Sequence, residues 1–276
     1  MTLGRTQAAA QLESRGLAPR RSLGQNFVVD ANTVRRIARL AGVGPGDHVV
    51  EVGAGLGSLT LALAESGAEV LAVEIDNHLV PILEENTRDC ANVTVVHADA
   101  MQVDWHALLA AAPRWTLVAN LPYNVATPLI ADLLDFVPEI TAMLVMVQKE
   151  VGERLVAAPR AEAYGAVSVK VAYWATGSVV GIVPPTVFLP RPNVDSALVR
   201  IDRRGEPAVG PEVSRDRLFA LVRAGFGQRR KMLRRSLADI VDPEAFAAAG
   251  VDPTARAEEL DVYAWGRLAA ASGGAQ

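Results

Sequence analysis

Residues 49–57 have the sequence VVEVGAGLG, a short β-branched run that ends in closely spaced glycines. Leucine and alanine then recur at helical spacing over residues 59–64. Together they predict a buried strand, a tight glycine turn and a helix, in that order. Glycines let a ligand approach the backbone, and the helix amino terminus presents amides that lack intrahelical partners. The stretch predicts a ligand-binding turn in an α/β domain; a plain strand-to-helix turn is the alternative.

The same alternation continues over the first half of the chain. Strand-like runs occupy residues 70–75, 93–96, 116–119 and 143–147, with helical patterns between the earlier ones. Short, almost continuously apolar strands that alternate with helices are typical of a parallel sheet covered on both faces. The sequence therefore predicts a doubly wound, mainly parallel sheet that binds ligands at the carboxyl ends of its strands.

The pattern changes after about residue 200, where the chain becomes polar and is interrupted by glycine and proline. Beyond this point only helical patterns occur, over residues 218–224, 231–240, 243–249 and 258–270. We expect an α/β domain over residues 26–204 and a small helical domain over residues 205–276. Residues 1–25 are expected to form a flexible or partner-ordered amino-terminal segment.

Composition limits the possible classes of protein. The 276 residues carry a net charge of −4, which excludes a uniformly basic chain but not local nucleic-acid binding. A single cysteine, Cys90, excludes an intrachain disulfide and a cysteine-built zinc cluster, and the four histidines lack ligand spacing. No metal site is expected. No apolar run approaches the ~18 residues of a spanning helix, and no secretory signal core is present, so we expect a cytoplasmic protein.

Three acids, Glu51, Glu74 and Asp99, lie at the ends of successive predicted strands. The third glycine of the turn follows the second by two residues, whereas the dinucleotide fingerprint spaces them by three. A carboxylate such as Glu51 would repel a pyrophosphate but suits a ligand with ammonium and sulfonium groups, such as S-adenosyl-L-methionine. Glu74 is placed to accept the ribose hydroxyls and Asp99 the adenine amino group. For each acid taken alone, the alternative is a solvated carboxylate at the end of a strand that binds no ligand.

The fourth predicted strand runs into Asn120, Leu121, Pro122 and Tyr123. An exocyclic adenine nitrogen is a poor nucleophile because its lone pair is delocalised into the ring. The Asn120 side-chain carbonyl and a backbone carbonyl at Leu121 or Pro122 can hold its two protons, and Tyr123 can stack on the base. The segment therefore predicts a catalytic loop for methyl transfer to adenine; a strand-ending turn with a buried tyrosine is the alternative.

Residues 217–235 contain seven cationic side chains and no acid. Arginines on a helix form a surface that contacts phosphates, although a solvated helix face is the common alternative. We predict RNA contact here, through Arg223, Arg229, Arg230, Lys231 and Arg234.

These motifs occur together with LGQNF at residues 23–27, QKEV at 148–151, VPP at 183–185 before Phe188, VDSA at 194–197 and FGQRRK at 226–231. In this order, over nearly the whole chain, the sequence resembles the ribosomal small-subunit adenine dimethyltransferases (the KsgA/RsmA family). One departure is Ala54, where many relatives have proline.

The resemblance implies a Rossmann-like class I S-adenosylmethionine-dependent methyltransferase domain with a small helical domain. It implies dimethylation of two adjacent adenosines in the 3′-terminal hairpin loop of 16S rRNA in the 30S or pre-30S particle, a role in small-subunit biogenesis, and a monomer. Phe188 would face Tyr123 across the adenine slot. The cofactor would contact Asn26, Val28, Gly53, Gly55, Glu74, Ile75, Asp99, Ala100 and Asn120.

Other functions share part of this pattern. An Erm-type 23S rRNA methyltransferase has the cofactor loop and the Asn-x-Pro-Tyr-like element, but the VPP, VDSA and FGQRRK segments favour the small-subunit enzyme. A ribosome-assembly factor with secondary catalysis is a second alternative. The intact segment 120–123 indicates that catalysis is retained, but it does not exclude the assembly role, and the two can coexist. A relative of mitochondrial transcription factors would need a longer targeting segment than residues 1–20 supply.

Overall fold

The computed structural model describes residues 3–20 and 23–273, without the side chains of residues 123 and 124. The chain divides into two compact units. The first comprises Met1–Gly152 and Ser178–Asp202, and the second Glu153–Gly177 and Arg203–Gln276. Among the described residues, no helix combines the length and apolarity needed to cross a membrane.

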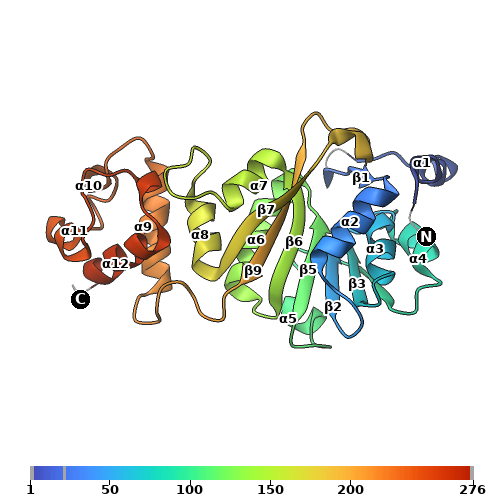
Figure 1. The fold of residues 1–276 in the computed structure, drawn as a ribbon, viewed down its shortest axis with the longest axis horizontal. Helices are drawn as coiled ribbons and strands as arrows, with labels where there is room; N and C mark the ends of the chain where they lie inside the picture. Colours follow the sequence, from blue (N-terminus) through green and yellow to red (C-terminus); the bar gives the residue numbers. More distant parts are fainter. Residues whose placement is uncertain (1–2, 21–22, 274–276) are drawn as a thin grey trace. The chain divides into compact units, whose positions relative to one another are not determined.

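A seven-stranded sheet forms the centre of the first unit, in the order β4-β3-β2-β5-β6-β9-β7 (Figure 1). The strands are β2 (His48–Val52), β3 (Glu69–Glu74), β4 (Val93–His97), β5 (Trp115–Asn120), β6 (Ile140–Gln148), β7 (Ala175–Val183) and β9 (Ser196–Arg203). Strands β2 to β6 pair in parallel, and β9 pairs antiparallel with β6. The predicted fold, a mainly parallel α/β sheet, is confirmed.

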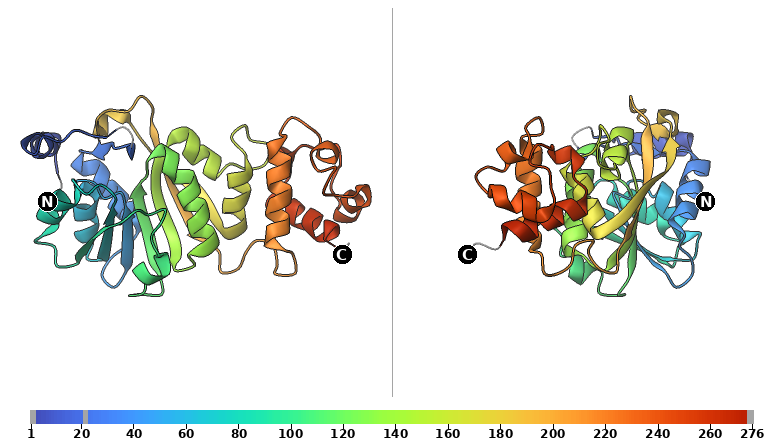
Figure 2. Two further views of the ribbon diagram at one scale, coloured as in Figure 1. Left: turned by 180° about the vertical axis from the view of Figure 1, so that it is seen from behind. Right: turned by 60° about the vertical axis from the view of Figure 1, so that its left-hand side comes forward.

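Helices cover both faces of this sheet. Helices α2 (Ala31–Ala41) and α3 (Ser58–Ala64) lie on one face, and α6 (Tyr123–Phe136) covers the other, as the reverse view in Figure 2 shows. Ile37 and Leu63 pack with Val118 and Leu144 of the sheet. The remaining helices between β3 and Leu155 are α4 (Val80–Thr87), α5 (Trp105–Leu108) and α7 (Lys149–Leu155). Apolar side chains on both faces explain why the strands lack polar alternation.

The amino-terminal segment, expected to be flexible or ordered by a partner, contains a helix. Residues Arg5–Ser14 form helix α1, in which Ala8 and Leu12 are buried, and they pack with Leu3 and Leu56. Farther along, strand β1 (Phe27–Val28) pairs with β8 (Phe188–Leu189), which follows the 3-10 turn η2 (Pro185–Val187). Only Ala8 and Leu12 of α1 are buried, and two positions are too few to give a recognisable helical pattern of apolar residues.

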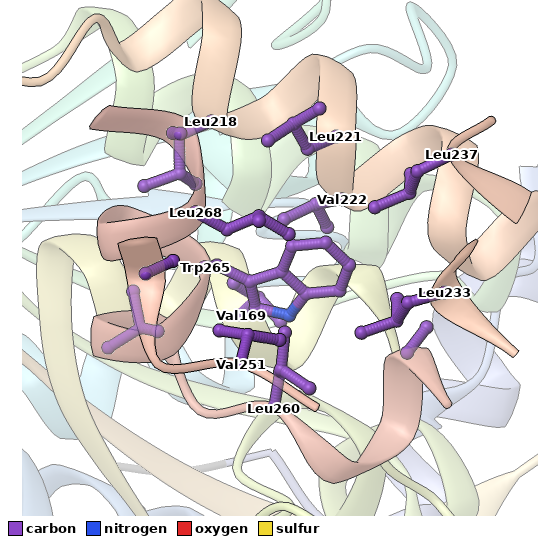
Figure 3. Packing of buried hydrophobic residues seen from close by; sticks show 14 of the residues in the cluster. Val169, Leu218, Leu221, Val222, Leu233, Leu237, Val251, Leu260, Trp265 and Leu268 are labelled. Carbon is purple, nitrogen blue, oxygen red and sulfur yellow. The ribbon is translucent and has the colours of Figure 1, made fainter. Parts of the chain in front are cut away.

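The second unit is helical around Trp265, whose side chain is fully buried between leucines and valines (Figure 3). Tyr164, Val169 and Tyr173 belong to the same core. For that reason residues 153–177 join the helical unit, and the expected division after residue 204 differs from the observed one. The helices are α8 (Ala166–Trp174), α9 (Arg215–Gly227), α10 (Leu233–Ser236), α11 (Pro243–Ala249), η3 (Ala257–Glu259) and α12 (Val262–Ser272).

Helix α10 is a single turn, shorter than the helix expected over residues 231–240. Its start is held outside helical geometry, because Met232 forms an isolated bridge with Arg256 and the Leu233 amide donates to the Ala255 carbonyl at 2.8 Å. This tertiary pairing overrides the local helical preference.

Two glycines near the end of α9 give a matched test of this packing. A Cβ at Gly225 would lie 2.7 Å from a ring carbon of Trp265, whereas a Cβ at Gly227 would meet nothing within 4 Å. Gly225→Ala should lower the free energy of unfolding by about 1–3 kcal/mol, because the buried indole has no room to move. Gly227→Ala should change it by less than about 1 kcal/mol, in the stabilising direction. Urea unfolding of both variants checks this, and equal stabilities would refute the close packing.

Candidate functional site

A cavity of about 100 Å³ lies at the carboxyl ends of β2, β3 and β5 in the first unit. These ends meet because the strands are parallel neighbours in the sheet, with Val52 opposite both Val73 and Ala119. The cavity brings together most of the predicted cofactor and catalytic residues. Its lining includes Asn26, Val28, Gly53, Gly55, Glu74, Ile75, Asn120, Leu121, Pro122 and Phe188.

The glycine turn is closed by a carboxylate from the neighbouring strand. Glu74, at the end of β3, accepts the Gly55 amide at 2.7 Å and the Asp76 amide at 2.8 Å, one on each oxygen. Gly55 has a φ of +59°, and a Cβ there would lie 3.0 Å from the Phe27 ring, so glycine is required on both counts. Burial raises the pKa of Glu74 above its ordinary value. A carboxylate has four lone pairs on its two oxygens, so it can also accept a hydrogen bond from a ligand hydroxyl.

Glu51 is the second buried acid of the cavity, only 2 % exposed. Its Oε2 accepts no hydrogen bond within the part of the chain that the structure describes. Burial raises the pKa of Glu51 to about 8. A buried carboxyl with an unused oxygen beside a glycine turn fits a ligand that brings a positive charge or a hydrogen-bond donor.

The segment before β1 contacts the predicted catalytic loop directly. The Asn120 side-chain nitrogen donates to the Asn26 carbonyl at 2.9 Å, and the Asn26 side chain donates to the Gly24 carbonyl at 3.1 Å. Gly24 has a φ of +63°, and a Cβ at this position would lie 2.8 Å from the Cβ of Pro122. The segment LGQNF therefore fixes the orientation of the Asn120 amide and leaves its Oδ1 to accept.

A buried acid that sequence reasoning missed anchors the same segment. Asp76, 4 % exposed, accepts the Gln25 side-chain amide at 2.8 Å and forms an ion pair with Arg20 at 3.3 Å. Gln25 in turn accepts the Arg20 backbone amide at 2.8 Å. Asp76 follows the predicted ribose-binding Glu74 by two residues, so its position near the site could have been predicted. Its partners could not, because they lie about fifty residues earlier in the chain.

The sequence left open whether the backbone carbonyl of Leu121 or that of Pro122 accepts a proton of the substrate amine. The Pro122 carbonyl accepts the amides of Val125 at 3.1 Å and Ala126 at 3.0 Å in the first turn of α6. Its lone pairs are thus engaged, and the Leu121 carbonyl is the better acceptor for a substrate amine. Tyr123 begins α6, but its side chain lies outside the described residues.

Three of the predicted residues need separate comment. Asp99 and Ala100 do not line the cavity, and the Asp99 carboxylate accepts the Met101 amide at 2.9 Å and the Gln102 side chain at 2.7 Å. Phe188 lines the cavity while only 2 % exposed, because its ring also packs in the core with Val28 and Val183. Phe188 is therefore both a core residue and part of the cavity lining.

The predicted RNA-contacting residues lie in the second unit and are exposed. Arg229 differs from the others, since it pairs with Glu258 at 2.6 Å and donates to the Glu162 carbonyl at 2.8 Å. Arg217, in the same cationic run, donates to the carbonyls of Ile240 and Ser272. The exposed positive surface therefore consists mainly of Arg223, Arg230, Lys231, Arg234 and Arg235.

Comparison with known proteins is consistent with this geometry. The family model for ribosomal RNA adenine dimethylase matches residues 16–271. A ribosomal RNA small subunit methyltransferase A from Cutibacterium acnes is 51% identical over 260 residues, 90% of this chain and 86% of that protein. The protein of the same name from Leifsonia xyli subsp. xyli is 49% identical over 279 residues, which cover 97% of this chain and 98% of that protein. The solved structure of the 23S rRNA methyltransferase ErmE has a TM-score of 0.70 at 27% identity, covering 89% of this chain and 99% of that one.

The raised pKa of Glu51 has a measurable effect on stability. With a folded-state value of about 8 against an ordinary 4.5, the folded protein retains a proton that the unfolded chain loses. The contribution of Glu51 to stability therefore falls as the pH rises between about 5 and about 8, by up to about 1.4 kcal/mol per pH unit. Glu51→Gln, which cannot ionise, should remove this slope in urea unfolding measured across the range. Parallel profiles for the two proteins would contradict the burial argument.

Proposed function

Because the chain belongs to the ribosomal RNA adenine dimethylase family, we propose that its target is the small ribosomal subunit. Membership of this family indicates an S-adenosylmethionine-dependent methyltransferase that acts on adenine in ribosomal RNA. The proposed reaction is N6,N6-dimethylation of two adjacent adenosines in the 3′-terminal hairpin loop of 16S rRNA, in the 30S or pre-30S particle. The cavity carries this proposal, because it joins the glycine turn and Glu74 to Asn120 at one edge of the sheet.

The residues of the cavity fit S-adenosylmethionine as the methyl donor. Glu51 Oε2, which has no hydrogen-bond partner among the described residues, suits the cationic end of that molecule. The Glu74 carboxylate is proposed to accept the ribose hydroxyls. Gly53 and Gly55 allow close approach of the backbone, and Asn26, Val28 and Ile75 complete the lining. The assignment of Asp99 and Ala100 to the adenine stays a prediction from the sequence, because neither lines the cavity. Bound there, the donor supplies a methyl group on a sulfonium, already an activated leaving group.

Asn120 is proposed to orient the target amine. Its Nδ2 is engaged with the Asn26 carbonyl, so its Oδ1 is fixed as an acceptor. Together with the Leu121 carbonyl it accepts both N–H groups of the exocyclic nitrogen, which favours pyramidal geometry with the lone pair directed outward. Pro122 holds this turn rigid at the start of α6. Positioning and electrostatics then lower the barrier without a covalent enzyme intermediate.

Two aromatic residues are proposed to hold the flipped base. Phe188 lines the cavity beside Asn120 and Pro122, and Tyr123 follows Pro122 in the chain. An unstacked base regains stacking energy between such rings, by about 1–3 kcal/mol per aromatic contact.

The choice of the small subunit over an Erm-type 23S target rests on the relatives. The two relatives named small-subunit methyltransferases are about half identical to this chain, against 27% for the 23S rRNA enzyme. The exposed cations of the second unit are proposed to contact rRNA phosphates. A monomeric state, a cytoplasmic location and a role in subunit biogenesis stay predictions.

The direct test is incubation with labelled S-adenosylmethionine and unmethylated 30S or 50S particles, followed by mapping of the modified base. We expect label in the 3′-terminal hairpin of 16S rRNA. Asn120→Ala should reduce the rate at least a hundredfold while particle binding is retained, because it removes one of the two acceptors for the amine. Label in 23S rRNA alone would overturn the small-subunit proposal, and normal turnover of the variant would overturn the catalytic assignment.

The RNA surface is tested by reversing two cations that have no part in the internal ion pairs described. Arg230→Glu with Lys231→Glu should weaken particle binding about tenfold. The slope of log Kd against log salt concentration should fall by the equivalent of about one to two phosphate contacts. Arg88→Glu with Arg114→Glu is the matched control. It makes the same change in charge at exposed positions before β4 and β5, the sheet edge opposite the cavity. Equal effects of the two pairs would show that net charge, and not this surface, governs binding.

A further inference from the structure

The segment that carries Phe188 is held by the amino-terminal part of the chain. Strand β8 pairs only through two residues, with Val28 opposite Phe188 and Phe27 opposite Leu189. One further bond joins the Val29 amide to the Val187 carbonyl at 2.9 Å. A two-residue ladder is a weak attachment for a side chain that has to meet a flipped base.

Arg5 of α1 supplies a second attachment for the same segment. Its Nη2 donates to the Thr186 carbonyl at 2.7 Å and to the Phe188 carbonyl at 3.0 Å. Hydrogen bonds from a charged donor are stronger than neutral ones, and a pair of them to alternate carbonyls fixes the backbone around Val187. Helix α1 lies before residues 16–271, which the family model matches.

The opposite end of α1 is attached to the cofactor side of the cavity. Gln11 and Asn86 exchange side-chain hydrogen bonds at 2.6 and 3.1 Å, and Asn86 also donates to the Leu56 carbonyl in the glycine turn at 2.9 Å. Leu12 packs in the same apolar cluster as Leu56. Because α1 is rigid between these contacts, it connects the glycine turn to the backbone of Phe188.

We propose that Arg5 is a positioning residue for the target adenine: it holds the Phe188 segment in register with the cavity. Arg5 acts through the two carbonyls and touches neither substrate nor cofactor. The inference rests on the proposed function, in which Phe188 is a wall of the adenine slot. It assigns a positioning role to a helix outside the cavity.

The experiment compares Arg5→Ala with Arg15→Ala. Arg5 lies in α1 and Arg15 directly follows it. Arg15 pairs with Glu85, and among the described residues it has no hydrogen bond or ion pair with residues 184–189. With 30S particles as substrate, Arg5→Ala should lower kcat about tenfold, while the Kd for S-adenosylmethionine from calorimetry stays within about twofold of the parent. Exchange of the backbone amides of residues 186–189 should accelerate in Arg5→Ala alone. Arg15→Ala should match the parent in all three measurements.

Three results would overturn the inference: an unchanged kcat and exchange rate in Arg5→Ala, the same loss in both variants, or a loss of cofactor affinity that accounts for the fall in rate. The first would show that the ladder with β1 is sufficient. The second would assign the effect to the packing of α1. A parent protein without activity on 30S particles would instead refute the proposed function, and the two failures are therefore distinguishable.

Discussion

The carboxylate of Glu74 is the contact on which the site depends. It binds the amide of Gly55 in the glycine turn and the amide of Asp76 after β3, so one buried group fixes the chain on both sides of the strand end. Asp76 then holds Gln25, and the segment that follows Gln25 holds the side chain of Asn120. A parallel sheet makes this possible, because it brings the ends of β2, β3 and β5 to one edge.

The two buried acids of the cavity differ in how well their oxygens are hydrogen-bonded. Both oxygens of Glu74 are paired with amides, whereas Oε2 of Glu51 accepts no hydrogen bond from the residues described. A buried acid without full compensation lowers stability, and protonation relieves only part of that cost. Such local violations of good packing concentrate where a ligand is to complete the arrangement. Glu74 is therefore held in place by the backbone of the site itself, whereas Oε2 of Glu51 is suited to a ligand alone.

The central strands could be predicted because both of their faces are buried and their sequences are nearly continuous apolar runs. Strand β7 was beyond such reasoning: most of its residues are exposed, and its sequence contains Gly177 and Gly181. The strand-end acids and the glycine turn were also predictable, since they follow strands directly. The contacts of Asp76 with Gln25 and of Arg5 with the Phe188 segment join residues far apart in the chain, and no local pattern encodes them. Asn26 and Phe188 were reached only through the family resemblance.

The helical unit is assembled from two separate stretches of chain, with β7 to β9 between them. A single cut after residue 202 would remove α9 to α12 but leave α8 behind, with Val169 and Tyr173 stripped of their apolar partners. An autonomous sheet domain therefore cannot be obtained by shortening the chain from its carboxyl end. It would need an internal excision of residues 153–177 as well, which breaks the covalent path into β7. In evolutionary terms, the two units are expected to be inherited, duplicated and lost together.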